Sequence, residues 1–152
     1  MIRPLVRPLV CSLVRSLIGA IVPGGGEPAQ FITNGTFDGG SACWTVGPGW
    51  SIVGGIAEQS GFADALSQEF GGLTVPLISG NDYTLTLDVL VRVGGAVRVA
   101  LSGDGSQTLY ESAATGLAIS TAFTANGNHT TLIILSPGEV AIAVDNIRVV
   151  PA

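Results

Sequence analysis

The sequence has few charged residues, and its basic residues are all arginine. Lysine is absent, and Asp, Glu, Lys and Arg together make up 11% of the 152 residues. Eleven acidic and six basic residues give a net charge of −5 at pH 7. An acidic body repels phosphates, so nucleic acid is an unfavourable partner. The low charge and the 47% hydrophobic content argue against a disordered chain and for one folded domain.

Residues that carry chemistry are also scarce. The two cysteines, Cys11 and Cys43, are too few for a disulfide framework, so we expect reduced cysteines and folding in the cytoplasm. His129 is the only histidine, and its distance from either cysteine matches no zinc motif. The sequence contains no G-x-S-x-G motif and no paired carboxylates. These absences predict a protein that is not an enzyme and that needs no catalytic cofactor.

Glycine is abundant, with 22 residues, and it separates short β-type segments. Apolar and polar residues alternate within these segments, as is typical of half-buried strands. Regular short strands with glycine-rich turns predict an all-β fold, a two-sheet antiparallel sandwich over residues 27–152. The expected strands cover residues 31–33, 43–46, 50–53, 65–70, 83–93, 97–101, 107–111, 117–124, 130–135 and 140–149. The expected core includes Trp50, Tyr83, Leu85, Leu87, Val99, Ile142 and Val144. Along the strand of residues 83–93, Val91 and Val93 continue the apolar face of Tyr83.

Residues 1–26 differ from the rest and predict an N-terminal docking arm. They hold three arginines and no acid, and they repeat the pattern RPLV, RPLV, CSLV, RSLI. Prolines exclude a helix at the start, so we expect an extended segment over 1–7, a helix over 8–21 and a glycine-rich hinge. Its apolar face would bind a partner protein or other copies of the chain in a homo-oligomer, for instance a trimer. The expected docking residues are Arg3, Leu5, Arg7, Leu9, Val10, Leu13, Val14, Arg15, Leu17, Ile18 and Ile21.

A signal peptide or a membrane span is the alternative interpretation of this arm. Arg7 and Arg15 interrupt the apolar stretch, and no small-x-small cleavage site follows it. A span containing Arg15 would also be short for a bilayer. We therefore expect no membrane span.

Several motifs in the body resemble those of a known fold family. They are Asn34-Gly35-Thr36-Phe37-Asp38, Trp44, Gly49-Trp50-Ser51-Ile52 and the segment 144–149. This set resembles the galactose-binding-like jelly rolls of carbohydrate-binding modules, which also occur in phage capsid-decoration and tail proteins. The resemblance implies a jelly roll in which the first and last strands pair. It also implies a structural calcium ion beside them, for which the matching acids are Asp38 and Asp145. The alternative is that these two acids belong only to a turn and to a β-bulge, which the phase shift after Val144 predicts.

The aromatic residues bear on sugar binding. Trp44 and Trp50 are in phase with aliphatic neighbours, so we expect both in the core rather than on a sugar-binding surface. Tyr110 is then the best single candidate for stacking on a ligand. With both tryptophans buried, strong sugar binding is not expected.

Three functions stay open from the sequence. The favoured one is a virion structural protein made in the host cytoplasm. It would be a phage capsid decoration (cement) protein or a head or tail fibre protein, anchored to other virion proteins by the arm. The alternative is a carbohydrate-binding adhesin or receptor-binding module of a tail or secreted protein, with a cell-surface glycan as ligand. The third is a secreted or membrane-anchored domain.

Overall fold

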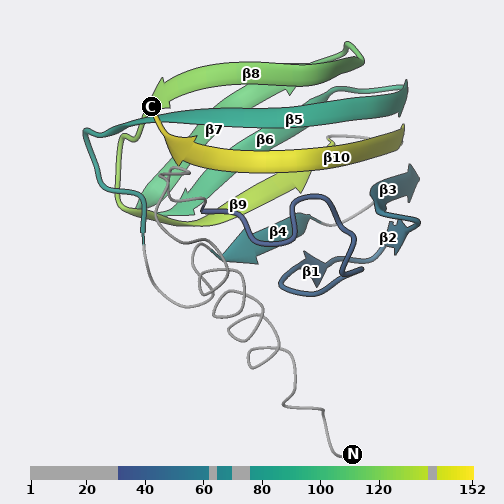
Figure 1. Cartoon of the computed structure of the whole chain (residues 1–152). Helices are drawn as coiled ribbons and strands as arrows, with labels where there is room; N and C mark the ends of the chain where they lie inside the picture. Colours follow the sequence, from purple (N-terminus) through teal and green to yellow (C-terminus); the bar gives the residue numbers. More distant parts are fainter. Residues whose placement is uncertain (1–30, 62–64, 70–75, 137–139) are drawn as a thin grey trace, which may run out of the picture.

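The computed structural model describes residues 31–61, 65–69, 76–136 and 140–152, which form a sandwich of two antiparallel sheets (Figure 1). Within this part of the chain there is no helix, so the all-β prediction is confirmed. The predicted docking arm and its helix lie outside the described residues. No helix in the described part is long and apolar enough to cross a membrane.

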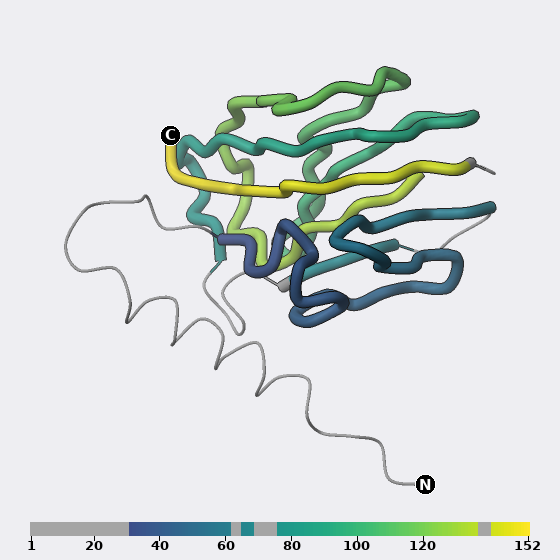
Figure 2. Tube along the Cα trace, turned by 45° about the vertical axis from the view of Figure 1, so that its right-hand side comes forward, coloured from purple at the N-terminus to yellow at the C-terminus, as the bar shows by residue number. Residues whose placement is uncertain are grey.

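Each sheet has five strands. Sheet A has the order β1 (Thr45–Val46), β4 (Leu66–Glu69), β9 (His129–Leu135), β6 (Val97–Gly103) and β7 (Gly105–Ser112). Sheet B has the order β2 (Trp50–Val53), β3 (Ile56–Gly61), β10 (Val140–Pro151), β5 (Asp82–Val93) and β8 (Gly116–Thr124). Figures 1 and 2 place the C-terminus beside the start of β5, in agreement with the pairing of Pro151 with Tyr83.

The core lies between the two sheets and is built by the alternation seen in the sequence. Along β6, Val97, Val99 and Leu101 are fully buried, whereas the residues between them are half-buried. All seven core residues named from the sequence are buried, and Trp44 is buried with them. Burying each large apolar side chain contributes about 1.5–3 kcal/mol, so this interior is the main source of stability.

The far end of β5 departs from the prediction. Alternation placed Val91 and Val93 on the buried face, but they are 48% and 64% exposed. The reason is a bulge: Val144 pairs with Val89 while the preceding Ala143 pairs with Val91, so Leu90 is an extra residue. One extra residue turns the following side chains to the opposite face.

Two other strand predictions are wrong. β3 was not predicted, because its residues Glu58, Gln59 and Ser60 break the apolar alternation. Residues 31–33 do not form a strand, although the Phe31 amide donates to the Val149 carbonyl at 2.9 Å. Instead, the Gln68 side chain of β4 binds the backbone N–H and C=O of Thr33, each at 2.7 Å. This segment therefore bridges the two sheets rather than extending one of them.

The loop of residues 34–44 folds around the side chain of Asn34. The Asn34 amide donates to the carbonyls of Gly40 and Ala42, and its carbonyl oxygen accepts from the Gly39 amide. The backbone carbonyl of Asn34 accepts the indole N–H of Trp44 at 2.9 Å. The Trp44 ring packs on the buried ring of Phe37, with 5.1 Å between centroids. The sequence motif that carries the family resemblance is therefore a structural loop.

The implied pairing of the first and last strands is not found in the described residues, because β1 pairs with β4 while β10 lies between β3 and β5. The loop of residues 34–44 contacts the last strand instead. Gly35 accepts a hydrogen bond from the Ile147 amide at 3.0 Å. A Cβ atom at Gly35 would lie 1.9 Å from the Ile147 carbonyl oxygen, so only glycine allows this approach. The predicted bulge in β10 is confirmed, because the register shifts between Asp145 and Arg148 and Asn146 has a positive φ of 51°.

Candidate functional site

A pocket of about 510 Å³ lies at the end of the sandwich where β5 begins and β10 ends, and we call it the terminal pocket. Its volume is within the range of small-molecule sites. Three separate segments form it: Phe31, the turn before β5 together with the first residues of that strand, and the last two residues of the chain. The lining residues are Phe31, Ile78, Gly80, Asn81, Asp82, Tyr83, Pro151 and Ala152.

The aromatic wall of the terminal pocket is held in place by the core. The ring of Phe31 meets the ring of Tyr83 edge-on, with 5.5 Å between centroids and an interplanar angle of 86°. Tyr83 is 3% exposed, and its other neighbour is the ring of Phe123 at 5.7 Å. The Tyr83 hydroxyl accepts a hydrogen bond from the Ile78 amide at 2.9 Å. Phe31, which is half-buried and lines the pocket, therefore packs against a tyrosine ring that is itself held in place.

Two polar side chains line the same pocket. One carboxylate oxygen of Asp82, Oδ1, accepts from the Thr124 hydroxyl at 2.6 Å, which fixes the carboxylate. Within the described residues, neither Oδ2 of Asp82 nor the side-chain amide of Asn81 makes a hydrogen bond. The backbone of Asn81 is anchored, since its carbonyl accepts from the Ala125 amide at 3.0 Å. The pocket therefore offers a carboxylate oxygen and an amide beside an aromatic ring.

A chain of hydrogen bonds leads from the terminal pocket to the buried histidine. The Thr124 carbonyl accepts from the Gln107 amide at 2.8 Å, and the Gln107 carbonyl oxygen accepts from the Asn126 backbone at 3.0 Å. Asn126 Oδ1 in turn lies 2.7 Å from His129 Nε2. Because Asn126 Oδ1 can only accept, His129 carries its proton on Nε2. This network joins strands of both sheets at the pocket end.

His129 is a structural residue in this arrangement. It is the first residue of β9, it is fully buried, and its Nδ1 atom has no hydrogen-bond partner in the described residues. Burial lowers the pKa of His129 below its usual value, and the negative charge of Asp104 opposes this shift. A fully buried imidazole whose Nε2 atom is bound to Asn126 is not arranged for acid–base chemistry on a ligand.

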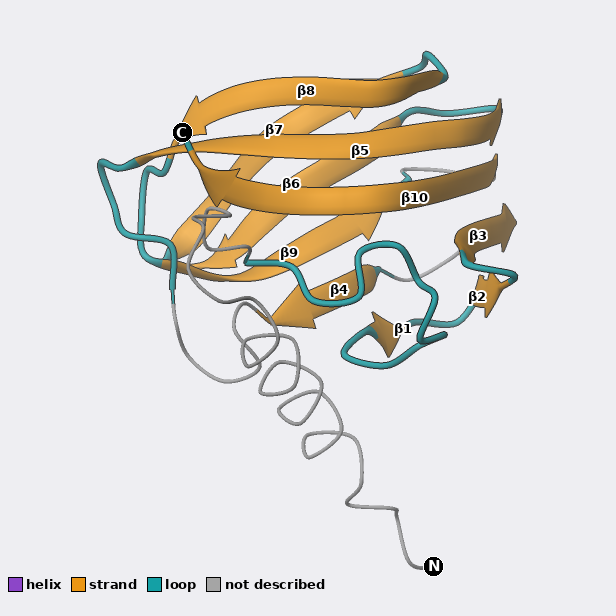
Figure 3. Ribbon diagram, viewed as in Figure 1, coloured by secondary structure: helices purple, strands orange, loops and turns teal. Residues whose placement is uncertain are grey.

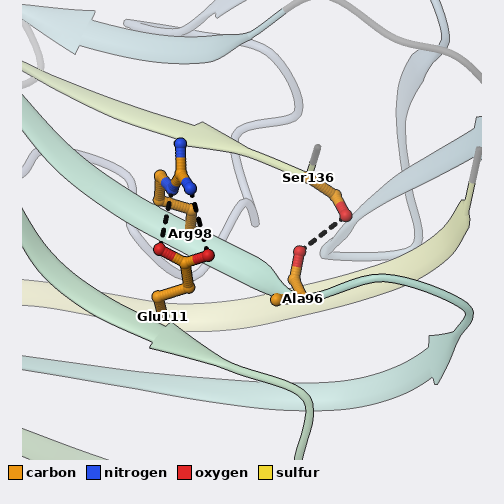
Figure 4. Close-up of polar contacts among 4 residues, drawn as sticks. All are labelled: Ala96, Arg98, Glu111 and Ser136. Carbon is orange, nitrogen blue, oxygen red and sulfur yellow. Dashed lines mark hydrogen bonds and ion pairs between the residues drawn. The ribbon is translucent and has the colours of Figure 1, made fainter. Parts of the chain in front are cut away.

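The outer face of sheet A carries an ion pair. Arg98 of β6 donates two hydrogen bonds to Glu111 of β7, each at 3.0 Å (Figure 4). These bonds lower the pKa of the Glu111 carboxyl. Figure 4 also shows the Ser136 hydroxyl bound to the Ala96 carbonyl at 2.6 Å. Arg98 and Glu111 therefore bind each other, and they are less available to a ligand than the polar groups of the terminal pocket.

The predicted aromatic ligand residue does not lie on this outer face. Tyr110 is half-buried, pairs with the buried Val99, and packs against the core. Trp44 and Trp50 are 2% and 7% exposed, as predicted, so neither offers a ring to a sugar. A ligand contact at Tyr110 stays a prediction.

The two predicted calcium ligands interact but form a small site. Burial raises the pKa of Asp145, and repulsion from Asp88 and Asp38 raises it further, although the hydrogen bond from the Asn146 backbone opposes these effects. Asp38 Oδ2 already accepts from the Thr36 hydroxyl at 2.8 Å. Among the described residues, no three His, Cys, Asp or Glu side chains group closely enough to hold a metal ion. Calcium takes six to eight oxygens, more than these carboxylates supply, so the calcium ion stays a prediction.

Cys43 corrects one expectation from the sequence. The chain was expected to keep reduced cysteines, but Cys43 is disulfide-bonded. The other cysteine of the sequence, Cys11, lies outside the described residues. Disulfides are typical of oxidising compartments, so the bond does not support the expected cytoplasmic folding.

Comparison with solved structures identifies the architecture. The N-terminal cellulose-binding domain of Cellulomonas fimi β-1,4-glucanase C aligns with a TM-score of 0.54 at 18% identity, over 82% of this chain and 98% of that one. A CBM4 module aligns with a TM-score of 0.51 at 16% identity, over 77% of this chain and all of the other. The chain has the jelly-roll fold of carbohydrate-binding modules.

A third jelly roll of this kind is a variant of the family 29 module CBM29-2, complexed with cellulohexaose. It aligns with a TM-score of 0.51 at 12% identity, over 80% of this chain and 88% of that one. No family model matches the sequence, and no curated protein matches it. These neighbours support the fold implied by the sequence motifs, and they give the virion prediction no support.

The terminal pocket is the part of this jelly roll that the sequence did not reveal. Tyr83 was predicted as a core residue, and no role was predicted for Phe31, Asn81 or Asp82 in a common site. The contributing segments lie more than a hundred residues apart between Phe31 and Pro151. The local signal was the Gly80-Asn81-Asp82 turn, which predicted only a chain reversal.

Proposed function

We propose that the protein is a non-catalytic glycan-binding module that holds a saccharide in the terminal pocket. The jelly-roll neighbours support this proposal, because one is a cellulose-binding domain and another is complexed with cellulohexaose. The observation that carries it is the chemistry of the pocket, an aromatic ring beside a carboxylate and an amide. The proposal takes up the carbohydrate-binding alternative of the sequence. The virion role stays a prediction.

The pocket groups match the two kinds of surface on a sugar ring. The ring of Phe31 offers an apolar plane to the C–H face of a pyranose. Oδ2 of Asp82 accepts a hydrogen bond from a sugar hydroxyl, and the Asn81 amide can donate to one hydroxyl and accept from another. Since Thr124 and Tyr83 hold Asp82 and Phe31 in position, little side-chain entropy is lost on binding.

The expected affinity is modest. One half-buried ring supplies less stacking area than a pair of tryptophans, and both tryptophans of this chain are buried. We therefore expect dissociation constants above about 1 μM, which corresponds to a binding free energy weaker than about −8.2 kcal/mol. This agrees with the expectation from the sequence that sugar binding is not strong.

A glycan array probed with the full chain tests the proposal. The array should carry plant, fungal and bacterial saccharides, with cello-oligosaccharides among them. The pocket variant is Phe31→Ala, and the matched control is Tyr110→Ala, which removes the half-buried aromatic ring of β7 outside the pocket. Melting curves of both variants check that the sandwich stays folded.

The expected result is retention of one class of saccharide by the native chain and by Tyr110→Ala, and its loss in Phe31→Ala. Retention of no saccharide at any concentration would contradict the proposed function. Loss of binding in Tyr110→Ala alone would contradict the pocket and return the site to the residue predicted from the sequence.

A further inference from the structure

The four edge strands of the sandwich differ in how they are protected against pairing with another chain. Each sheet has two edges, β1 and β7 in sheet A and β2 and β8 in sheet B. β1 has two residues and β2 has four, so these edges offer few backbone groups. Natural sheets also protect edges with charges, prolines and bulges.

β7 and β8 are the long edges, and only β7 carries a charge. β7 contains Glu111, which is bound to Arg98, and its pairing with β6 shifts register after Val99. β8 has nine residues with neither charge nor proline, and no Asp, Glu, Lys or Arg occurs between Glu111 and Glu139. Figure 3 shows β8 at the upper edge of the molecule with no strand beyond it. Within the described residues β8 pairs with β5 alone, so its other side is open.

The open part of β8 has defined limits. At its start, Ala118 has φ of 51° and the register against β5 shifts between Leu87 and Val89, which bends the strand. At its end, the carbonyl of Thr124 is occupied by the Gln107 side chain. The regular, unprotected segment therefore spans residues 119–123.

We propose that β8 pairs with β8 of a second copy, antiparallel and centred on Thr121. In this register each Ile119 lies opposite Phe123 of the second copy, and the two Thr121 residues face each other. Pairs of an aromatic with a β-branched residue, and of two threonines, are among the favourable cross-strand pairs. Ile119, Thr121 and Phe123 are half-buried on the inner side, whereas Ser120 and Ala122 are exposed on the outer side.

A second copy of the chain is the partner that fits the open edge of β8 best. An uncharged strand meets itself without repulsion, although the chain as a whole carries −5. Antiparallel pairing about one residue is symmetric, so both copies use the same surface and the assembly closes as a dimer. The joined sheet B has 5 + 5 = 10 strands, which is within the size of natural open sheets.

Charge substitutions on the outer side of β8 test the dimer. In the proposed register Ser120 lies opposite Ala122 of the second copy, so the double variant Ser120→Lys with Ala122→Lys sets lysines directly opposite each other twice. Like charges in this position are destabilising. Sedimentation velocity of the full chain should show a concentration-dependent dimer, and this variant should sediment as a monomer.

A second double variant tests the register itself. Ser120→Lys with Ala122→Glu puts opposite charges across the same two pairs, so the dimer should return. Ser60→Lys on the interior strand β3 is the matched control, because Ser60 is also exposed but lies away from the edge. It should leave the dimer unchanged. Melting curves confirm that each variant is folded.

Three results would overturn the proposal. A native chain that is monomeric at every concentration excludes the dimer. A dimer that persists in the lysine–lysine variant places the contact elsewhere, for example in the N-terminal arm. Equal dissociation of the lysine–lysine and lysine–glutamate variants excludes the register centred on Thr121.

Discussion

Replacing Asn34 with alanine should destabilise the protein more than any other exposed or half-buried asparagine substitution. Its side chain makes three hydrogen bonds to the loop backbone, at 2.9, 3.0 and 3.0 Å. Each such bond contributes about 1 kcal/mol. Asn34 also has φ of 54°, a left-handed conformation that costs alanine about 1 kcal/mol more. The expected loss for Asn34→Ala is therefore about 4 kcal/mol.

Equilibrium urea unfolding followed by tryptophan fluorescence measures this loss. Trp44 is a suitable probe, because its indole N–H binds the Asn34 carbonyl in the same loop. Asn128→Ala is the matched control: the Asn128 side chain accepts one hydrogen bond, from the Ser79 amide, so the expected loss is about 1 kcal/mol. A urea-unfolding curve of Asn34→Ala that matches the native chain, or equal losses of unfolding free energy in the two variants, would refute the structural role of Asn34.

Three further predictions concern pH, calcium and the arm. Burial lowers the pKa of His129 in the folded chain, so the unfolded chain takes up the proton first as the pH falls. The free energy of unfolding should therefore decrease below about pH 6.5, and the midpoint of urea unfolding should move to lower urea. In His129→Gln this pH dependence of the urea midpoint should vanish. If calcium binds at Asp38 and Asp145, a chelator should lower the melting temperature, and an unchanged curve would reject the ion. Deleting residues 1–22 should leave the sandwich folded, as judged by circular dichroism, while abolishing attachment to the partner of the arm; attachment without the arm would contradict the docking prediction.

Local alternation predicted much of the sandwich, because side-chain burial in a strand has a period of two residues. It placed Leu85, Leu87 and Val99 in the core, and the phase shift after Val144 revealed the bulge at Asn146. These features depend on neighbours in the sequence.

Features that depend on contacts between residues far apart in the sequence could not be predicted from local alternation. The bulge at Leu90 exists only because β5 pairs with β10, so Val91 appeared to belong to the core. β3 is a strand because it lies between β2 and β10, although its own sequence is mostly polar. The terminal pocket needs Phe31 and Pro151 side by side, and nothing local to either residue indicates that.

An NMR titration of the full chain shows whether a saccharide binds at the terminal pocket. Increasing amounts of a cello-oligosaccharide are added, and backbone amide shifts are followed in the native chain and in Asp82→Asn. We expect shifts confined to Asn81, Asp82 and the other pocket residues. Binding should be weakened about tenfold in the variant, as expected for a lost hydrogen bond to a charged group. Shifts on the outer face of sheet A around Arg98 and Glu111, with Asp82→Asn binding as tightly as the native chain, would contradict binding at the terminal pocket.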